Sequence, residues 1–192
     1  MVAVEAAAAL LAWLGASLVV LADGRRGLSL GLALLTAGFA VLALAGGLPL
    51  GAAVVAAGGG IAAWQCWRSP AANWGIMPAG STPRLVLCIG SGLLGLWIAA
   101  VVTLGPGSAL RFAILVVVGL MGARVLSSSE LHVVLAGIAG LALALGAAPG
   151  LDLLSDGTVP DVAGGLIAAG VMALPRSAHV HSGATEPDKR AT

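Results

Sequence analysis

The chain carries few charges for its length. Of its 192 residues, nine are lysine or arginine and eight are aspartate or glutamate, so charged residues make up 9% of the sequence. Soluble domains contain about 25% charged residues. The net charge of +1 provides no strongly basic surface, which a nucleic-acid-binding protein needs to neutralise phosphates. We therefore expect no nucleic-acid partner.

Tyrosine is absent, phenylalanine occurs twice, and there are only two cysteines. Cys66 and Cys88 lack the spacing of a metal site, and we expect both to remain thiols. Hydrophobic residues instead make up 59% of the chain, and its mean hydropathy is +1.07. The 29 glycines are typical of membrane helices that pack closely, because small residues let two backbones approach.

Apolar runs long enough to cross a bilayer recur along the chain, and a transmembrane helix needs about 20 such residues. In the central stretch Leu110–Leu145, two runs flank the short polar segment Arg124–Glu130. We predict an all-α, polytopic integral membrane helix bundle over residues 1–175, followed by a disordered cytoplasmic tail over residues 176–192. The seven predicted transmembrane helices are Val2–Ala22, Leu28–Ala45, Leu50–Trp67, Leu85–Leu104, Leu110–Leu126, Leu131–Ala148 and Asp161–Leu174.

The basic residues predict how the chain threads the membrane. With seven spans, the loops alternate between two sides, and only Arg111 lies on the side opposite to the other eight lysines and arginines. Because Lys and Arg gather in cytoplasmic loops, we expect the N-terminus outside and the C-terminus in the cytoplasm. The first run has Glu5 and no basic residue at its start, so we expect a retained helix rather than a cleaved signal. These features are typical of a multi-pass protein of the bacterial plasma membrane, the cell inner membrane.

Ionisable side chains are missing from the centres of the predicted spans. Such groups are costly in a membrane and usually functional, so a self-sufficient ion pump is not expected. The sequence also has no paired carboxylates, nucleophile elbow, phosphate-binding loop or zinc pattern. We therefore expect no enzymatic activity, no catalytic residue, no cofactor and no metal site.

A polar cluster lies between the fifth and sixth predicted spans, where Arg124, Glu130 and His132 accompany three serines. One interpretation is a site at the cytoplasmic mouth that loads protons or binds a cofactor. The other, which we favour, is a helix junction. In it, Ser128 or Ser129 caps the sixth helix, Glu130 interacts with the positive end of its dipole, and Arg124 closes the preceding helix.

Small residues and tryptophans indicate how the helices contact one another and the lipid. We expect Gly95, Gly140 and Gly165 to lie at helix–helix contacts, since each belongs to a pair of small residues spaced four apart. Three of the five tryptophans, Trp64, Trp67 and Trp74, fit an aromatic belt at the cytoplasmic interface. The remaining two, Trp13 and Trp97, lie near span centres, where they either line a lipid or substrate pocket or fill space between helices.

The last three spans resemble a known membrane subunit. The resemblance lies in Gly119-Leu-Met-Gly122, in the run from Leu131 to Leu141, and in Val159-Pro160-Asp161, and it covers about a third of the chain. In these segments the chain resembles the small three-helix subunit shared, in variant form, by complex I, Mrp-type antiporters and hydrogenase-4 complexes (component E). The complex I subunit carries a membrane-embedded glutamate just after the residue aligned with Ile138, where this chain has Ala139. The resemblance therefore implies a structural neighbour in such an assembly, without that proton-handling group.

Two functions fit these features. The first is a non-catalytic integral membrane subunit that packs within a larger complex, respiratory or ion-translocating, with the lipid bilayer and other membrane subunits as partners. The alternative is a small transporter or channel for an uncharged or lipid-like solute, acting as a homo-oligomer. A transporter often shows broken helices with polar groups at the midplane, and Gly58-Gly59-Gly60 is the only hint of a break.

Overall fold

The computed structural model describes residues 2–68, 82–101, 107–128, 130–147 and 159–173. These ranges contain seven α-helices and no strand, so the predicted all-α class is confirmed. The helices are α1 (Val2–Leu21), α2 (Arg25–Ala45), α3 (Pro49–Trp67), α4 (Thr82–Val101), α5 (Ser108–Ser127), α6 (Leu131–Gly146) and α7 (Val159–Ala173). The tail over residues 176–192, most of the loop from Arg68 to Arg84 and the end of the fourth predicted span (residues 102–104) lie outside the described residues.

The helix bounds differ from the predicted spans mainly at their starts. Helix α2 begins at Arg25 rather than Leu28, because the two arginines after Gly24 form its first turn. Arginine is a good helix former, and a hydropathy pattern does not register a polar first turn. Helix α3 begins at Pro49, a residue whose fixed φ suits the first helical position.

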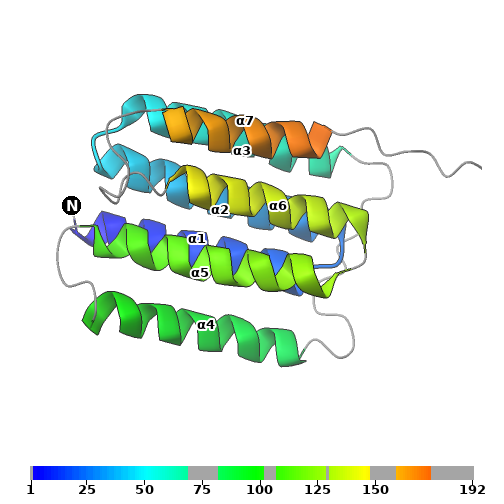
Figure 1. Ribbon diagram of the computed structural model, residues 1–192, viewed down its shortest axis with the longest axis horizontal. Helices are drawn as coiled ribbons and strands as arrows, with labels where there is room; N and C mark the ends of the chain where they lie inside the picture. The colour runs from blue at the N-terminus through cyan, green and yellow to red at the C-terminus, as the bar shows by residue number, and fades with distance from the viewer. Residues whose placement is uncertain (1, 69–81, 102–106, 129, 148–158, 174–192) are drawn as a thin grey trace, which may run out of the picture.

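The helices form two stacked layers (Figure 1). Helices α1, α2 and α3 lie side by side in one layer, and α5, α6 and α7 lie in the other. Each helix of the second layer packs on its counterpart: α5 on α1, α6 on α2 and α7 on α3. Helix α4 lies at one edge, where it packs mainly against α5 and also contacts α1.

The helices have the dimensions of membrane spans. A helix of 20 residues is about 30 Å long, which matches the hydrocarbon core of a bilayer. Within the described ranges, α1, α2, α3 and α5 are long and apolar enough to cross a membrane, and Thr82–Ile98 and Leu131–Gly146 are shorter apolar helices. The described structure is therefore a helical bundle suited to a lipid bilayer.

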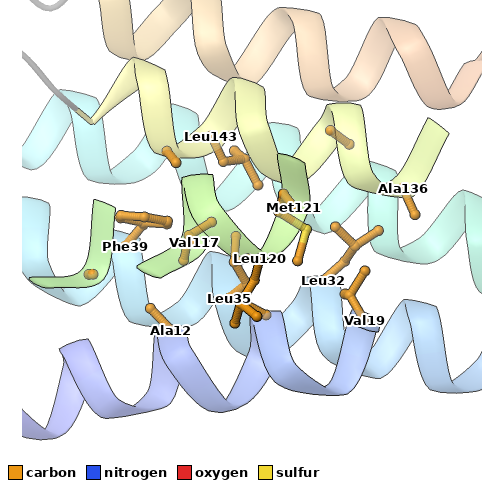
Figure 2. Packing of buried hydrophobic residues seen from close by; sticks show 14 of the residues in the cluster. Ala12, Val19, Leu32, Leu35, Phe39, Val117, Leu120, Met121, Ala136 and Leu143 are labelled. Atoms are coloured by element: carbon orange, nitrogen blue, oxygen red, sulfur yellow. The ribbon is translucent and has the colours of Figure 1, made fainter. Parts of the chain in front are cut away.

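The centre of the bundle is filled by apolar side chains from both layers (Figure 2). Leu32, Leu35 and Phe39 of α2 and Leu120 and Met121 of α5 belong to this cluster, and all five are fully or almost fully buried. Many large side chains point outward instead, and on α4 these include Leu93, Leu94, Leu96 and Trp97. An apolar surface of this kind suits lipid as the solvent, since lipid tails are as apolar as leucine.

Helices α1 and α2 approach so closely that glycine is required on both. A Cβ on Gly38 would lie 2.7 Å from the backbone nitrogen of Ala12 and 2.7 Å from the carbonyl oxygen of Ala8. A Cβ on Gly31 would lie 2.9 Å from the carbonyl oxygen of Gly15 in α1. The seven-residue spacing of Gly31 and Gly38 thus places both on the face that contacts α1, as a helical repeat requires.

The glycine triplet Gly58–Gly60 does not interrupt α3. It allows neighbouring helices to pack closely against α3. A Cβ on Gly58 would clash with the backbone of Gly165 in α7, and one on Gly59 would clash with the side chain of Thr36 in α2. A Cβ on Gly60 would meet nothing within 4 Å. Two of the three glycines are therefore needed for close packing, and the third faces outward.

Neither cysteine forms a disulfide in the described part of the chain. The thiol of Cys66 lies 3.3 Å from the carbonyl oxygen of Arg25, and that of Cys88 lies 3.9 Å from the carbonyl oxygen of Ser17. Both side chains are buried, so each donates to backbone of a neighbouring helix.

Gly58→Ala and Gly60→Ala form a matched pair of substitutions in the triplet. We expect Gly58→Ala to destabilise the bundle by about 1–3 kcal/mol, because its methyl group forces α3 and α7 apart. Gly60→Ala adds the same methyl group in open space and should be neutral or slightly stabilising. The measurement is the midpoint of detergent-induced unfolding, followed by circular dichroism. Equal midpoints for the two variants would contradict the close contact between α3 and α7.

Candidate functional site

Most of the described arginines meet at one end of the bundle. Because neighbouring helices alternate in direction, the ends of α1, α3 and α5 lie beside the starts of α2, α4 and α6. This end, which we call the basic end, carries Arg25, Arg26, Arg68, Arg84 and Arg124. Glu5 and Arg111 lie in the first turns of α1 and α5, at the opposite end.

Arg124 is the only charged residue among the buried side chains of the described chain, with 2% of its surface exposed. It lies in the last turn of α5 and extends toward the turn after α1. Its Nη2 donates a hydrogen bond to the carbonyl oxygen of Ala22, at 3.0 Å, and another to Oδ1 of Asp23. We expected Arg124 to close its own helix. It instead joins α5 to α1.

Asp23 binds a second arginine from α4. Nη1 of Arg84 lies 2.9 Å from Oδ1 and 3.1 Å from Oδ2 of the same carboxylate. Asp23 itself lies in the short turn between α1 and α2. One carboxylate thus connects this turn to α4 and α5, and we call Asp23, Arg84 and Arg124 the ionic clasp.

The charges of the clasp hold Asp23 ionised. Burial acts to raise the pKa of Asp23, but the hydrogen bond and positive charge of Arg124, followed by those of Arg84, outweigh it and lower the pKa below its ordinary value. A lowered folded pKa means that the clasp contributes its full stability above about pH 4, where an unfolded aspartate is already ionised. That contribution is lost as the pH falls through the lowered pKa.

His132 and Glu130 lie beside the clasp. Nε2 of His132 is 3.4 Å from the backbone oxygen of Asp23, and its Nδ1 is 3.4 Å from Oε2 of Glu130. The Glu130 side chain is 70% exposed, whereas that of His132 is 20% exposed. The three residues singled out in the sequence, Arg124, Glu130 and His132, are thus gathered around Asp23.

The predicted cap of α6 is wrong. The N-cap is Glu130 rather than Ser128 or Ser129, and its side chain makes no capping hydrogen bond. Ser128 instead ends α5, in an extended conformation, and Ser129 lies outside the described residues. The physical reason is that the Glu130 carboxylate is directed toward His132 rather than back to the first amides of the helix.

The chemistry of the clasp favours a structural role. Arginine does not lose its proton in proteins, and Asp23 stays ionised near neutral pH, so the three groups exchange no proton there. Nε of Arg124 is buried and makes no hydrogen bond, which leaves the guanidinium dependent on Asp23 and Ala22. Over the described residues, no three His, Cys, Asp or Glu side chains are grouped as metal ligands.

The sequence did not single out Asp23 or Arg84, the other two members of the clasp. The available signal was weak: the alternation of loops places both on the same side as Arg124. It does not show which of several charges on that side meet, because the partners are 61 and 101 residues from Asp23.

The three glycines expected at helix contacts lie at three different interfaces. A Cβ on Gly95 of α4 would clash with the side chain of Val116 in α5, and one on Gly140 of α6 would lie 2.8 Å from Sδ of Met121. A Cβ on Gly165 of α7 would lie 3.0 Å from the backbone oxygen of Val54 in α3. The contact at Gly140 involves the end of a flexible side chain, so it restricts substitution less than the backbone contact at Gly165.

No protein-family model, curated protein or solved structure matches this chain. The resemblance of the last three helices to the complex I, Mrp and hydrogenase-4 subunit therefore stays a prediction.

Asp23→Asn tests the ionic clasp. Removal of the carboxylate charge leaves Arg124 buried without a counter-charge, and because Asp23 is itself 41% exposed we expect a cost below the about 3–5 kcal/mol of breaking a fully buried pair. We expect the double variant Asp23→Asn/Arg124→Met to recover most of this loss, because it removes the uncompensated charge as well. Arg84→Gln should cost about 1 kcal/mol or less, since its side chain is 36% exposed.

The measurement is again the midpoint of unfolding in detergent, at neutral pH. If Asp23→Asn and the double variant are equally unstable, the charge of Arg124 is not what Asp23 compensates, and the clasp does not hold the helices as described.

Proposed function

We propose that the protein is a non-catalytic integral membrane subunit that packs within a larger membrane complex. The observation that carries this proposal is the surface of α4. Only a narrow strip of this helix, including Cys88, Gly92 and Gly95, is buried against the bundle. Its large side chains that are 44–65% exposed are Val86, Leu87, Ile89, Leu93, Leu94, Leu96, Trp97 and Val101.

A helix held at one edge by small residues offers a broad apolar face to a neighbouring transmembrane helix. Shape and van der Waals contact drive such association in lipid, because there is no hydrophobic gain. The clasp supports the same role, since its ionised groups serve to join helix ends rather than to carry protons. A subunit that acts by packing needs a stable bundle and an available face, and this chain has both.

The proposal includes seven membrane crossings, with the N-terminus outside and the C-terminus in the cytoplasm of a bacterial cell. The gathering of arginines at the basic end supports this orientation, because Lys and Arg mark the cytoplasmic side. Trp64 and Trp67 lie at the same end, with the guanidinium of Arg68 4.6 Å from the first ring and that of Arg26 5.7 Å from the second. Tryptophan beside arginine is typical of the membrane interface; Trp74 lies outside the described residues.

The alternative function, a small transporter for an uncharged or lipid-like solute, is favoured by a different observation. An apolar crevice with a volume of about 420 Å³ opens between α1, α4 and α5. Its walls would admit a hydrocarbon group, but they form one side of the bundle and do not lead through its centre, which is filled by side chains. The subunit role therefore remains our proposal.

Reporter fusions test the topology. We expect a reporter fused after Thr192 to be active in the cytoplasm and one fused before Met1 to be active outside, because the basic end should stay on the cytoplasmic side. The measurement uses paired reporters that are active on opposite sides of the membrane. Both termini on one face would contradict seven crossings.

Site-specific crosslinking tests the subunit role. A photo-crosslinking amino acid at Leu94, on the outer face of α4, should give an adduct of one defined protein mass in native membranes. The matched control is Leu166, which is similarly exposed, at 65%, on α7, a helix that packs on α3 and α6. We expect it to give lipid adducts only.

Two results would contradict the subunit role. The first is a chain that is purified alone and gives no protein adduct at Leu94. The second is a Glu130→Gln or His132→Ala variant that assembles normally but loses a transport activity, since the cluster at the basic end would then be an ion or proton site. We expect both variants to assemble and function like the unmodified chain.

A further inference from the structure

A crevice separates α4 from the rest of the bundle over part of its length. It consists of two adjacent hollows, of about 180 Å³ and about 420 Å³, which share Leu10, Leu96 and Phe112 in their walls. The smaller hollow lies deeper along α4, beside Trp13, and its lining is hydrocarbon, aromatic and glycine throughout. The larger one reaches the end opposite to the basic end, where Glu5 is part of its lining.

Specific contacts keep the crevice open. Nε1 of Trp13 donates a hydrogen bond to the carbonyl oxygen of Cys88, at 3.2 Å, which fixes the indole ring between α1 and α4. Gly92 faces this ring, and a Cβ there would lie 2.8 Å from it. Toward the other end, Ala6 and Ala9 leave the space between the helices unfilled. The hydrogen bonds that join α4 to Trp13 and to Asp23 thus lie away from the wider part of the crevice.

We propose that this crevice binds one acyl chain of a bilayer phospholipid that carries a primary amine in its headgroup. The hollow walls are apolar, and the larger hollow falls within the range of about 300–1,000 Å³ that is typical of ligand sites. A single hydrocarbon chain is narrow enough to enter both hollows.

The mouth of the crevice selects the headgroup. Glu5 places a carboxylate in the lining, and Ser108 of α5 adds a hydroxyl group. Arg111 lies in the same first turn of α5, beside the mouth but outside the residues that line the crevice. A primary ammonium donates charge-assisted hydrogen bonds to a carboxylate, and a phosphate accepts them from a guanidinium. A zwitterionic phosphatidylethanolamine therefore complements this mouth, whereas the negatively charged phosphatidylglycerol is opposed by Glu5.

The inference rests on the bundle lying in a bilayer, and it is independent of the subunit role. A chain that forms no complex could still bind this lipid, and a chain that forms one could leave the crevice empty. The crosslinking at Leu94 and the lipid experiment below therefore fail separately.

Fluorescence quenching of Trp13 tests the proposal, because bromine atoms on an acyl chain quench a tryptophan that they contact. The full chain is reconstituted in phosphatidylcholine vesicles, with phenylalanine in place of Trp64, Trp67, Trp74 and Trp97, so that only Trp13 remains. A matched protein retains only Trp97, which is 59% exposed on the outer face of α4 and reports bulk lipid. A small fraction of brominated phosphatidylethanolamine or brominated phosphatidylglycerol is then added.

We expect Trp13 to be quenched at a concentration of brominated phosphatidylethanolamine roughly tenfold lower than Trp97 requires, because a charge-assisted contact favours the site. Brominated phosphatidylglycerol should not show this preference. Glu5→Gln should make the two lipids equivalent at Trp13. Ala6→Phe, which fills the larger hollow, should abolish the preferential quenching, and Ala7→Phe, on an exposed position outside the lining, should not.

Each contrary result overturns the proposal. If Trp13 is quenched no more readily than Trp97, no lipid chain occupies the crevice, whether it is closed or filled by a second copy of the chain. If Ala6→Phe and Ala7→Phe behave alike, the quenching lipid lies elsewhere. Size-exclusion profiles and circular dichroism of each variant establish that it is folded before the quenching is compared.

Discussion

Close backbone contact between helices is the interaction on which this bundle depends. Lipid gives two apolar helices no hydrophobic reason to associate, so they must gain dispersion contacts that lipid tails cannot match. Gly31 and Gly38 bring α2 against α1, and Gly58 and Gly165 do the same for α3 and α7. Large apolar side chains such as Leu35 and Leu120 fill the centre of the bundle, and others cover its outside. The apolar outer surface thus follows from the solvent, and the glycines mark the places where two backbones meet.

The polar contacts fix the ends of helices that the glycine contacts bring together. Glycine contacts align helices along their length, but they do not fix one helix end against another. Asp23 does so for three segments at once, because both of its carboxylate oxygens accept hydrogen bonds from arginines of α4 and α5. Helix α4 lies at one edge of the bundle and is held by two such contacts: Arg84 binds Asp23 from its first turn, and Trp13 donates a hydrogen bond to the carbonyl oxygen of Cys88.

The local sequence pattern predicts the helices, but it does not predict which side chains from distant parts of the chain contact each other. Each helix follows from a mainly apolar run, and the gathering of arginines at one end follows from alternating loops. The seven-residue spacing of Gly31 and Gly38 is also a local pattern, and both lie on the face that contacts α1. The burial of Arg124 was not predictable, because it depends on a carboxylate 101 residues earlier in the chain. Nor was the crevice, which results from how α4 is positioned and not from any one run. The cap of α6 was mispredicted because serine preference was weighed without the competing pull of His132 on Glu130.

Because Asp23 precedes Arg84 and Arg124 in the chain, the three residues of the clasp are synthesised in a fixed order. During synthesis, this aspartate emerges 61 residues before Arg84 and 101 before Arg124. The hairpin of α1 and α2 can already close through its glycines while its turn still displays an unneutralised carboxylate, since chains fold from the N-terminus as they are made. That carboxylate can meet its two arginines only after α4 and α5 have been made, so the clasp is completed last.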